Sequence, residues 1–254
     1  MKRFTILAAW LVCACLPVAF AADTLESVEK AIVEKNEKLT SIQFRSVTNQ
    51  ELSSPQFTMK TDSESTVEAA KKGDVWMFRA EAKTKSSQKM GDQETKSDQA
   101  TLMVCDGKFN YVLSDTAGQK QAMKMAMSQD VSMISNKKFF DQLRKDHELK
   151  LLADEKAEGK DAWVVEATPK NAASSPMMSK MKFYFDKDSG MTVQVIGLNA
   201  EGKPMSTTVN KDIKINASIP DDRFTFKAPE GVTVMDMTSQ QPATPPSDKP
   251  EGGK

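Results

Sequence analysis

The sequence predicts a mainly β fold, of the α+β kind, in which about ten antiparallel strands form one large curved sheet. From Ser41 to Phe226, apolar and polar residues alternate in one short segment after another, which is the pattern of half-buried strands. Turn residues separate these segments, and helical spacing is confined to two places, one before the first strand and one among the later strands. A long meander of this kind is expected to curl, because curvature limits its exposed edges.

The first element is an amphipathic helix. Asp23 or Thr24 can cap its start, and Glu26 places an acid in the first turn. The spacing of the apolar residues predicts about four helical turns with one apolar face. These residues recur at steps of three and four, and they are Leu25, Val28, Ala31, Ile32, Leu39 and Ile42.

From Ser41 onward the apolar period changes to two, which predicts the first strands. Phe44 and Met59 each lie in an alternating segment. The runs 75–78 and 101–105 are apolar at nearly every position, which predicts strands covered on both faces. The polar segment 86–98 between these two runs is expected to be a mobile loop.

Asp106-Gly107 predicts a tight hairpin. It stands between the run 101–105 and the alternating residues Phe109 to Leu113. Such a pair favours a two-residue turn in which both positions have positive φ. Beyond this hairpin, Met123, Met125 and Met127 alternate on one face of the next predicted strand.

The second half of the chain shows the same pattern of alternating segments separated by turn residues. Residues 136–144 predict a short helix, and Phe183 and Phe185 lie in one of the strands that follow it. Asp188-Ser189-Gly190 and Glu201-Gly202 predict turns between later strands. Segment 171–176 is expected to be a loop, and Phe224 to Phe226 is expected to be the closing strand.

The termini predict export. Residues 1–21 read as a signal peptide, because Lys2 and Arg3 precede an apolar run that ends at Ala19-Phe20-Ala21. The folded domain is then expected over residues 22–237, with a disordered, proline-rich tail over 238–254. The expected location is the periplasm. In an alternative interpretation, Cys15 is lipidated and tethers the chain to a membrane.

Few residues offer catalytic or metal chemistry. Lysine plus arginine equal aspartate plus glutamate at 35 each, so the electrostatic footprint of nucleic-acid binding is missing. After the signal peptide one cysteine remains, Cys105, and the chain has one histidine, His147. One of each cannot build a typical zinc or copper site. We therefore expect no cofactor, no metal and no enzymatic activity.

Methionine is the positive signal, since the chain has 16 of them. Methionine side chains are flexible and polarisable, so they suit surfaces that accept variable apolar ligands as well as irregular cores. The alternating Met123, Met125 and Met127, and the cluster of Met177, Met178 and Met181, are candidates for the lining of an apolar cavity. Core filling remains the ordinary explanation for many of the others.

Several motifs together resemble the periplasmic outer-membrane lipoprotein carriers, the LolA-like family. These are the helix that ends at Leu39-Thr40-Ser41-Ile42-Gln43-Phe44, the hairpin Met103-Val104-Cys105-Asp106-Gly107-Lys108, and Phe183-Tyr184-Phe185-Asp186 with the turn at Gly190. Ile213-Lys214-Ile215-Asn216 and the segment from Phe224-Thr225-Phe226 to Gly231-Val232 complete the series. The resemblance covers roughly residues 23–236.

The resemblance implies an unclosed barrel of about ten to eleven strands, with helices that cover its open side above a hydrophobic cavity. It also implies a monomer that holds the acyl chains of a lipid or lipoprotein, with an inner-membrane transporter and an outer-membrane acceptor as partners. Ligand-binding candidates are Phe44, Met59, Trp76, Phe78, Met103, Met123, Met125, Met127, Phe183 and Phe185.

One departure concerns the latch of the helical lid. The family has a basic residue followed by proline before the strand of Trp76, where this chain has Lys72-Gly73. Lys72 is the candidate latch, although lysine lacks the planar fork of arginine. The alternative function is therefore kept, namely an envelope sensor of the same fold that binds lipid and signals to a membrane partner. A structural envelope protein with a filled core is a third possibility.

Overall fold

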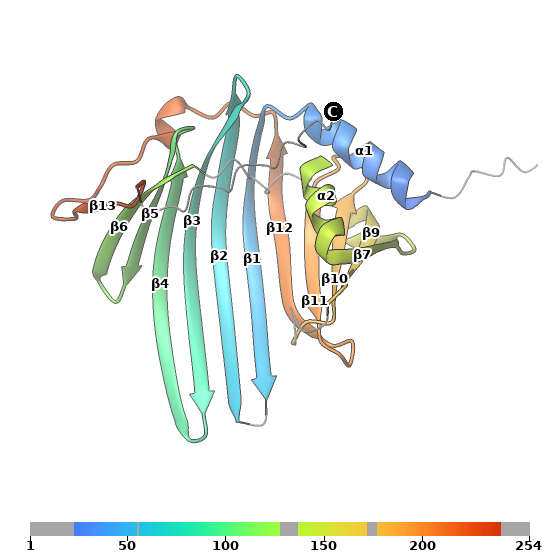
Figure 1. Cartoon of the computed structure of the whole chain (residues 1–254), viewed down its shortest axis with the longest axis horizontal. Coiled ribbons are helices and arrows are strands. Elements are labelled where there is room, and N and C mark those ends of the chain that lie inside the picture. Colours follow the sequence, from blue (N-terminus) through green and yellow to red (C-terminus); the bar gives the residue numbers. More distant parts are fainter. Residues whose placement is uncertain (1–22, 55, 128–136, 172–176, 240–254) are drawn as a thin grey trace, which may run out of the picture.

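The structure is a computed structural model, and it describes residues 23–54, 56–127, 137–171 and 177–239. One large sheet of thirteen strands dominates it, and the two α-helices lie across part of one face (Figure 1). In the order of the sheet the strands run β13-β6-β5-β4-β3-β2-β1-β12-β11-β10-β9-β7, and β8 pairs with β9. The two ends of this order do not pair with each other, so the barrel is unclosed, as predicted.

The elements follow the predicted order. The first half contains α1 (Leu25–Glu37), β1 (Ser41–Ser54), β2 (Phe57–Lys72), β3 (Val75–Met90), β4 (Gln93–Cys105), β5 (Phe109–Thr116) and β6 (Gln119–Ala126). The second half contains α2 (Lys137–Asp146), β7 (His147–Leu151), β8 (Glu155–Ala157), β9 (Lys160–Pro169), β10 (Lys180–Asp186), β11 (Thr192–Leu198), β12 (Pro204–Ile215), the 3-10 helix η2 (Asp221–Phe224) and β13 (Val234–Asp236).

Helix α1 begins as its sequence predicts. Thr24 is the N-cap, and its side chain accepts a hydrogen bond from the Ser27 backbone N–H while the Ser27 hydroxyl accepts one from the Thr24 N–H. This reciprocal capping satisfies backbone donors that the first turn leaves open. The helix is shorter than the apolar spacing suggested: it ends at Glu37, Leu39 lies in the connection, and Ile42 already belongs to β1.

The main core lies between the helices and the second half of the sheet. Val28 and Ile32 of α1 and Phe140 of α2 are each at most 1% exposed. They pack on buried residues of β9 and β10, and half-buried residues of β7 and β11 extend the contact. The helices therefore cover β7, β9, β10 and β11, whereas the long strands β1 to β4 extend beyond them and the shorter β5 and β6 lie farther along the sheet (Figure 1).

The prediction of a loop at 86–98 is wrong. Strands β3 and β4 continue through it as a paired hairpin, with Ser86 opposite Ser97 and Met90 opposite Gln93. Gly91, at φ 58°, provides the turn. The segment is polar because solvent contacts both faces of this hairpin. Its charged and hydroxyl residues still alternate with the period of two that is typical of a strand.

The closing strand was also predicted wrongly. Residues 221–224 form η2, and Thr225 to Thr233 belong to no strand. The last strand is β13, which pairs in parallel with β6 and makes the sheet not wholly antiparallel. The Phe-x-Phe alternation fits an extended segment that packs on the sheet without pairing: Phe224 is buried, Phe226 is half-buried and Thr225 between them is exposed. Two short strands, β8 and β13, account for most of the difference between thirteen strands and the predicted ten to eleven.

Two smaller expectations need correction. Only Gly107 of the Asp106-Gly107 pair has positive φ, at 89°, and the Asp106 carboxylate instead accepts hydrogen bonds from the backbone N–H groups of Lys108 and Phe109 at 2.8 Å. The run 75–78 is not covered on both sides, since Val75 is 39% exposed. The Asp188–Gly190 turn is as predicted, between β10 and β11.

Several expectations fall on residues outside the described ranges. The predicted signal peptide at 1–21, Cys15, nearly all of the predicted tail at 238–254 and most of the predicted loop at 171–176 lie there. Within the described residues, no helix is long and apolar enough to span a membrane.

Candidate functional site

The two faces of the long strands differ because side chains alternate across a sheet. We call the face on which α1 and α2 pack the helix-bearing face. The pairing register places Ile42, Ala69 and Phe78 opposite one another on β1, β2 and β3. Ile42 and Ala69 form a small core with Leu39, against which Phe78 packs. This cluster therefore lies on the helix-bearing face of β1 to β3, next to the part of the sheet on which the helices pack.

An apolar band crosses this part of the helix-bearing face. It consists of two neighbouring cross-strand rows on β1 to β6. Most of its side chains are half-buried, and Met103, at its centre, is 37% exposed. The first row is Ile42, Ala69, Phe78, Cys105, Asn110 and Met125, and the second is Phe44, Val67, Ala80, Met103, Val112 and Met123.

The structure brings a subset of the predicted ligand-binding residues together. Five of them belong to the apolar band: Phe44, Phe78, Met103, Met123 and Met125. Trp76 is two residues from Phe78 on β3 and packs on the same cluster. Met127 follows the end of β6 and is half-buried.

The remaining candidates lie apart from the band. Met59 pairs with Leu52 and Gln88 near the far end of β2, several polar rows away. Phe183 and Phe185 are buried under the helices at 9% and 0% exposure. Their rings pack with Phe139 and Phe140 of α2 at centroid distances of 5.7 and 5.8 Å. A ligand reaches these two phenylalanines only if the helices move.

An ion pair joins the two helices, which we call the helical lid. Arg144 of α2 donates two hydrogen bonds to the carboxylate of Glu29 of α1. Glu29 is only 12% exposed, and the hydrogen bond to it raises the pKa of Arg144. Sequence reasoning missed this pair. The available signal was an arginine in the last turn of one predicted helix and an acid in the middle of the other.

Helix α1 is also fixed to the turn between β10 and β11. The Lys35 ammonium donates to the Asp188 carbonyl at 3.0 Å, and the Asn36 side-chain amide donates to the Gly190 carbonyl at 3.3 Å. Gly190 has φ 72°, and a Cβ atom there would lie 3.1 Å from the Lys35 Cβ. Glycine is therefore required both by the backbone conformation and by the close approach of the helix.

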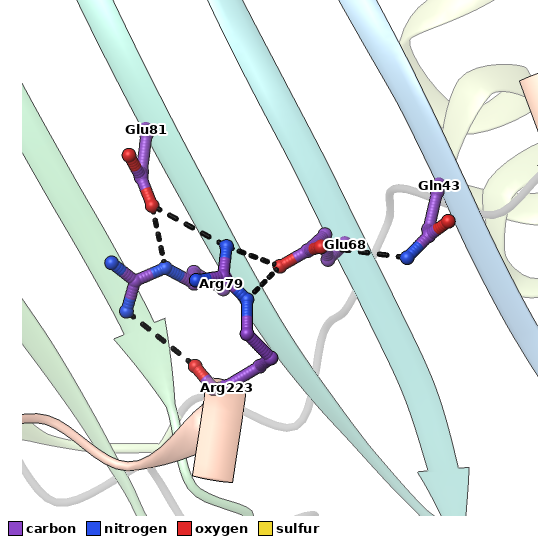
Figure 2. Close-up of polar contacts among 5 residues, drawn as sticks. All are labelled: Gln43, Glu68, Arg79, Glu81 and Arg223. Carbon is purple, nitrogen blue, oxygen red and sulfur yellow. Dashed lines mark hydrogen bonds and ion pairs between the residues drawn. The ribbon is translucent and has the colours of Figure 1, made fainter. Parts of the chain in front are cut away.

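Residues 221–236, which we call the C-terminal strap, cross the opposite face of the sheet. Figure 2 shows the polar contacts at the start of the strap. The Arg223 guanidinium donates from Nε and Nη2 to Oε2 of Glu68 at 2.8 Å, and its Nη2 lies 3.5 Å from Glu81. Arg79 binds Glu81 at 2.7 Å and donates to the Arg223 carbonyl at 3.5 Å.

Apolar and strand contacts hold the rest of the strap. Phe224 is 2% exposed, and the ring of Phe226 stacks on Tyr111 with 5.0 Å between centroids. Further on, β13 pairs with β6, and Asp236 lies 3.3 Å from the Lys124 ammonium. The strap thus links β2, β3, β5 and β6 on the face behind the apolar band.

The predicted latch, Lys72, contacts the strap. Its ammonium lies 2.7 Å from Asp221 of η2, and both side chains are exposed. An exposed pair of this kind contributes at most about 1 kcal/mol. Its partner is on the strap rather than on α1 or α2, so a latch between Lys72 and the helical lid stays a prediction.

Two cavities of about 590 and 580 Å³ lie elsewhere. The first is lined mainly by residues of β2 to β5 on the strap side, among them Leu102, Leu113 and Arg79. The second adjoins it around Lys83 and Asp115. None of the predicted ligand-binding residues lines either cavity, so a cavity among those residues also stays a prediction.

Reactive groups are scarce in the described part of the chain. No group of three or more histidine, cysteine, aspartate or glutamate side chains is arranged to hold a metal there. Cys105 is fully buried, and burial raises the pKa of its thiol. His147 is half-buried at the start of β7.

The sequence comparisons find weak relatives. A family profile described as an uncharacterized protein matches residues 130–241. The uncharacterized protein MJ0687 of Methanocaldococcus jannaschii is 27% identical over 139 residues, which are 53% of this chain and 37% of that protein. The chain therefore spans little more than a third of the length of this relative.

Comparison with solved structures bears on the fold. An uncharacterized conserved protein from Thermus thermophilus matches with a TM-score of 0.50 at 15% identity, over 82% of this chain and 96% of that chain. The Pseudomonas aeruginosa MucA/MucB complex has a TM-score of 0.47 at 13% identity, over 79% and 60%. The LolA superfamily protein NE2245 from Nitrosomonas europaea has 0.27 at 15%, over 78% and 97%.

The match to the Thermus thermophilus protein, with a TM-score of 0.50, bears on the fold alone. The observed architecture, an unclosed curved sheet with helices across one face, is the one expected of the LolA-like family. The chain therefore has a LolA-like fold.

Proposed function

We propose that this protein binds the acyl chains of a lipid or lipoprotein on the helix-bearing face of its sheet and carries them between membranes. The observation that supports this most directly is the apolar band. Its side chains are apolar except for that of Asn110, and Met103 at its centre is 37% exposed. The buried members are Ile42, Ala69, Val67 and Cys105. Covering such a surface with an acyl chain is favourable by about 0.8 kcal/mol for each buried methylene.

The helical lid gives the site a means of adjustment. It contacts the sheet beside the apolar band, and the pair of Arg144 and Glu29 joins its two helices. Separation of these helices from β9 and β10 would add Phe183 and Phe185 to the ligand surface. Methionines in the band can then adapt to chains of different length, because their side chains are flexible.

The setting that fits this function is the cell envelope. Residues 1–21 would act as a signal peptide and deliver the chain to the periplasm, with lipidation at Cys15 as the alternative. Residues 22–237 would form the binding domain and 238–254 a tail. Such a protein would meet an inner-membrane donor and an outer-membrane acceptor as a monomer, and it would not be an enzyme.

One observation favours a second function, that of a lipid-binding sensor. Glu68 stands between Val67 and Ala69, and Arg79 stands between Phe78 and Ala80. The apolar band and the anchor of the strap are therefore the two sides of the same stretches of β2 and β3. A ligand on one face that changes the twist of these strands would weaken or strengthen their contacts with Arg223 of the strap. A membrane partner that binds the strap would then respond to the ligand.

The test is ligand uptake by the protein purified under native conditions. Organic extracts analysed by mass spectrometry should contain an acylated ligand, and the delipidated protein should take up an apolar fluorophore. Met103→Asp should abolish this uptake, because it places a carboxylate in the apolar band. Met90→Asp is the matched control, since Met90 is 58% exposed at the β3–β4 turn.

The outcomes separate the functions. Equal uptake by the two aspartate variants would remove the apolar band from the proposal. A protein with no extractable acyl ligand and no fluorophore uptake would refute acyl binding altogether. Normal lipid localisation combined with lost stress signalling in a deletion strain would favour the sensor over the carrier.

A further inference from the structure

Charge is divided between the two faces of strands β1 to β6. On the strap side these strands carry arginines, lysines, aspartates and glutamates in almost every row. On the helix-bearing face Lys71, at the end of β2, is the one charged residue within these six strands as the structure describes them. The strap-side set is Arg45, Glu51, Lys60, Asp62, Glu64, Glu68, Lys72, Arg79, Glu81, Lys83, Lys85, Lys89, Glu94, Lys96, Asp98, Asp115, Lys120 and Lys124.

Below the apolar band, the helix-bearing face is polar but uncharged. The next two rows are almost entirely serine, threonine and glutamine. The first is Ser46, Ser65, Ala82, Thr101, Ser114 and Gln121, and the second is Thr48, Ser63, Thr84, Gln99, Thr116 and Gln119. We call these the hydroxyl rows.

Hydrogen bonds tie some of these hydroxyl groups together. Thr48 lies 2.9 Å from Thr208 of β12, and Ser63 lies 3.0 Å from Thr84. A hydroxyl both donates and accepts, so each retains capacity for a further partner. The hydroxyl rows therefore present neutral donors and acceptors next to an apolar surface.

A polar atom within the apolar band has no partner. Oδ1 of Asn110 is buried and accepts no hydrogen bond from the described residues. The register places Asn110 between Cys105 and Met125 in the first row of the band. A buried acceptor left open is unfavourable, and a ligand that donates a hydrogen bond at this place within the band would satisfy it.

Building on the proposed acyl-binding function, we propose that the site selects electrically neutral amphiphiles. The acyl chain lies on the apolar band, and an uncharged head group rich in hydroxyl or amide groups, as in an acylglycerol or a glycolipid, lies over the hydroxyl rows. An anionic head group is disfavoured there, since a carboxylate or phosphate next to an apolar surface needs a cation or several N–H donors. Lys71 is at the opposite end of the band from these rows.

The test uses ligands that share a twelve-carbon chain and differ in the head group. Monolaurin, dodecyl maltoside and laurate displace a neutral fluorophore from the delipidated protein, each below its critical micelle concentration and at about pH 8, where laurate is ionised. The two neutral ligands should bind at least about tenfold more tightly than laurate. A preference for monolaurin over the maltoside, or the reverse, distinguishes a glycerol from a sugar head group.

Neighbouring residues on opposite faces provide matched variants. Ser65→Lys places a cation in the hydroxyl rows and should strengthen laurate binding severalfold. Thr66→Lys adds the same charge on the strap side and should leave the selectivity unchanged. The two variants have the same net charge, because each replaces a neutral side chain by lysine. Both residues lie in the middle of β2, so we expect a similar effect on folding.

Three outcomes would overturn the inference. Laurate binding as tight as that of monolaurin to the parent protein would leave acyl binding intact but remove the selectivity. Equal gains for laurate in both lysine variants would show that net charge, not the uncharged face, controls binding. If none of the three ligands displaces the fluorophore, the proposed function fails together with the inference.

Discussion

Gly190 offers the sharpest test of how the helical lid is seated. Its φ of 72° lies in the left-handed region, and an added Cβ would lie 3.1 Å from the Lys35 Cβ and 3.4 Å from the Ile32 carbonyl oxygen. Gly202 has nearly the same φ, 75°, but nothing lies within 4 Å of its Cβ position. The pair Gly190→Ala and Gly202→Ala therefore separates backbone strain from helix contact.

The magnitude follows from two contributions. A non-glycine residue in the left-handed region costs about 1–2 kcal/mol, and this cost applies to both variants. At position 190, overpacking against α1 adds about 1–3 kcal/mol, because the Lys35 Cβ at 3.1 Å is bonded directly to the helix backbone and cannot rotate away. Gly190→Ala should thus lower the free energy of unfolding by about 1–3 kcal/mol more than Gly202→Ala.

Urea unfolding followed by tryptophan fluorescence measures this difference. Trp163 is buried below α1, and its indole N–H donates to Asp23 just before the helix at 2.9 Å. Its emission therefore reports on the lid as well as on the sheet. Linear extrapolation for both variants and the parent yields three free energies of unfolding, whose differences give the two destabilisations. Gly190→Ala should also take up an apolar fluorophore more readily, since its lid is displaced.

Equal destabilisation of the two variants, within about 0.5 kcal/mol, would refute the reasoning. Helix α1 would then not lie against the β10–β11 turn in solution. A large loss for Gly190→Ala without any change in fluorophore uptake would mean that the position of the lid does not control access to the ligand surface.

Three further predictions concern the strap, the thiol and a buried acid. Arg223→Ala should lower the free energy of unfolding by about 1–3 kcal/mol and expose the strap to protease, because Glu68, 15% exposed, loses its guanidinium partner and retains the hydrogen bond from Gln43. Cys105, whose thiol pKa is raised by burial, should resist iodoacetamide until the protein unfolds, as checked by mass spectrometry. Burial alone would raise the pKa of Asp186, but hydrogen bonds from Ser189 and a lysine lower it. Its contribution to stability, measured by urea unfolding against Asp186→Asn, should be present above about pH 4 and lost below it.

Each of these has a control or a contrary result. Arg45→Ala removes an exposed pair with Glu64 and should cost less than about 1 kcal/mol; a similar loss for Arg223→Ala would mean that the strap does not depend on this clamp. Native labelling of Cys105 would indicate that β4 opens. Stability curves against pH that run parallel for the parent and Asp186→Asn would exclude the depressed pKa of Asp186.

Local patterns in the chain were sufficient to predict most strands, because the period of two is a property of neighbouring residues. These patterns gave a wrong prediction where a strand segment has a polar composition like that of a loop. The hairpin around Gly91 looks like a loop because both of its faces meet solvent. The same segment carried an unused signal, since charged residues alternate with hydroxyl residues through β2, β3 and β4. That alternation predicts one charged and one neutral face.

The candidate site was predicted in part. Phe44, Phe78 and Met103 come together because they share one face of adjacent strands, and strand pairing between neighbours in sequence is predictable. Met59 shares the face but not the location, since distance along a strand of 16 residues separates it from the band. Phe183, which shares the face through distant pairings, becomes core because the helices settle there.

The sequence by itself determined the mainly β fold, the capped opening helix and the alternation that places apolar residues on one face. Only the tertiary structure decided which part of that face the helices bury and which part the described residues leave partly exposed. It also decided that the Phe224–Phe226 segment crosses the other face, held by Arg223 and Glu68, which lie 155 positions apart in the chain. The physical reason is that periodicity arises between neighbouring residues, whereas the seating of the lid and the strap depends on contacts between residues far apart in sequence.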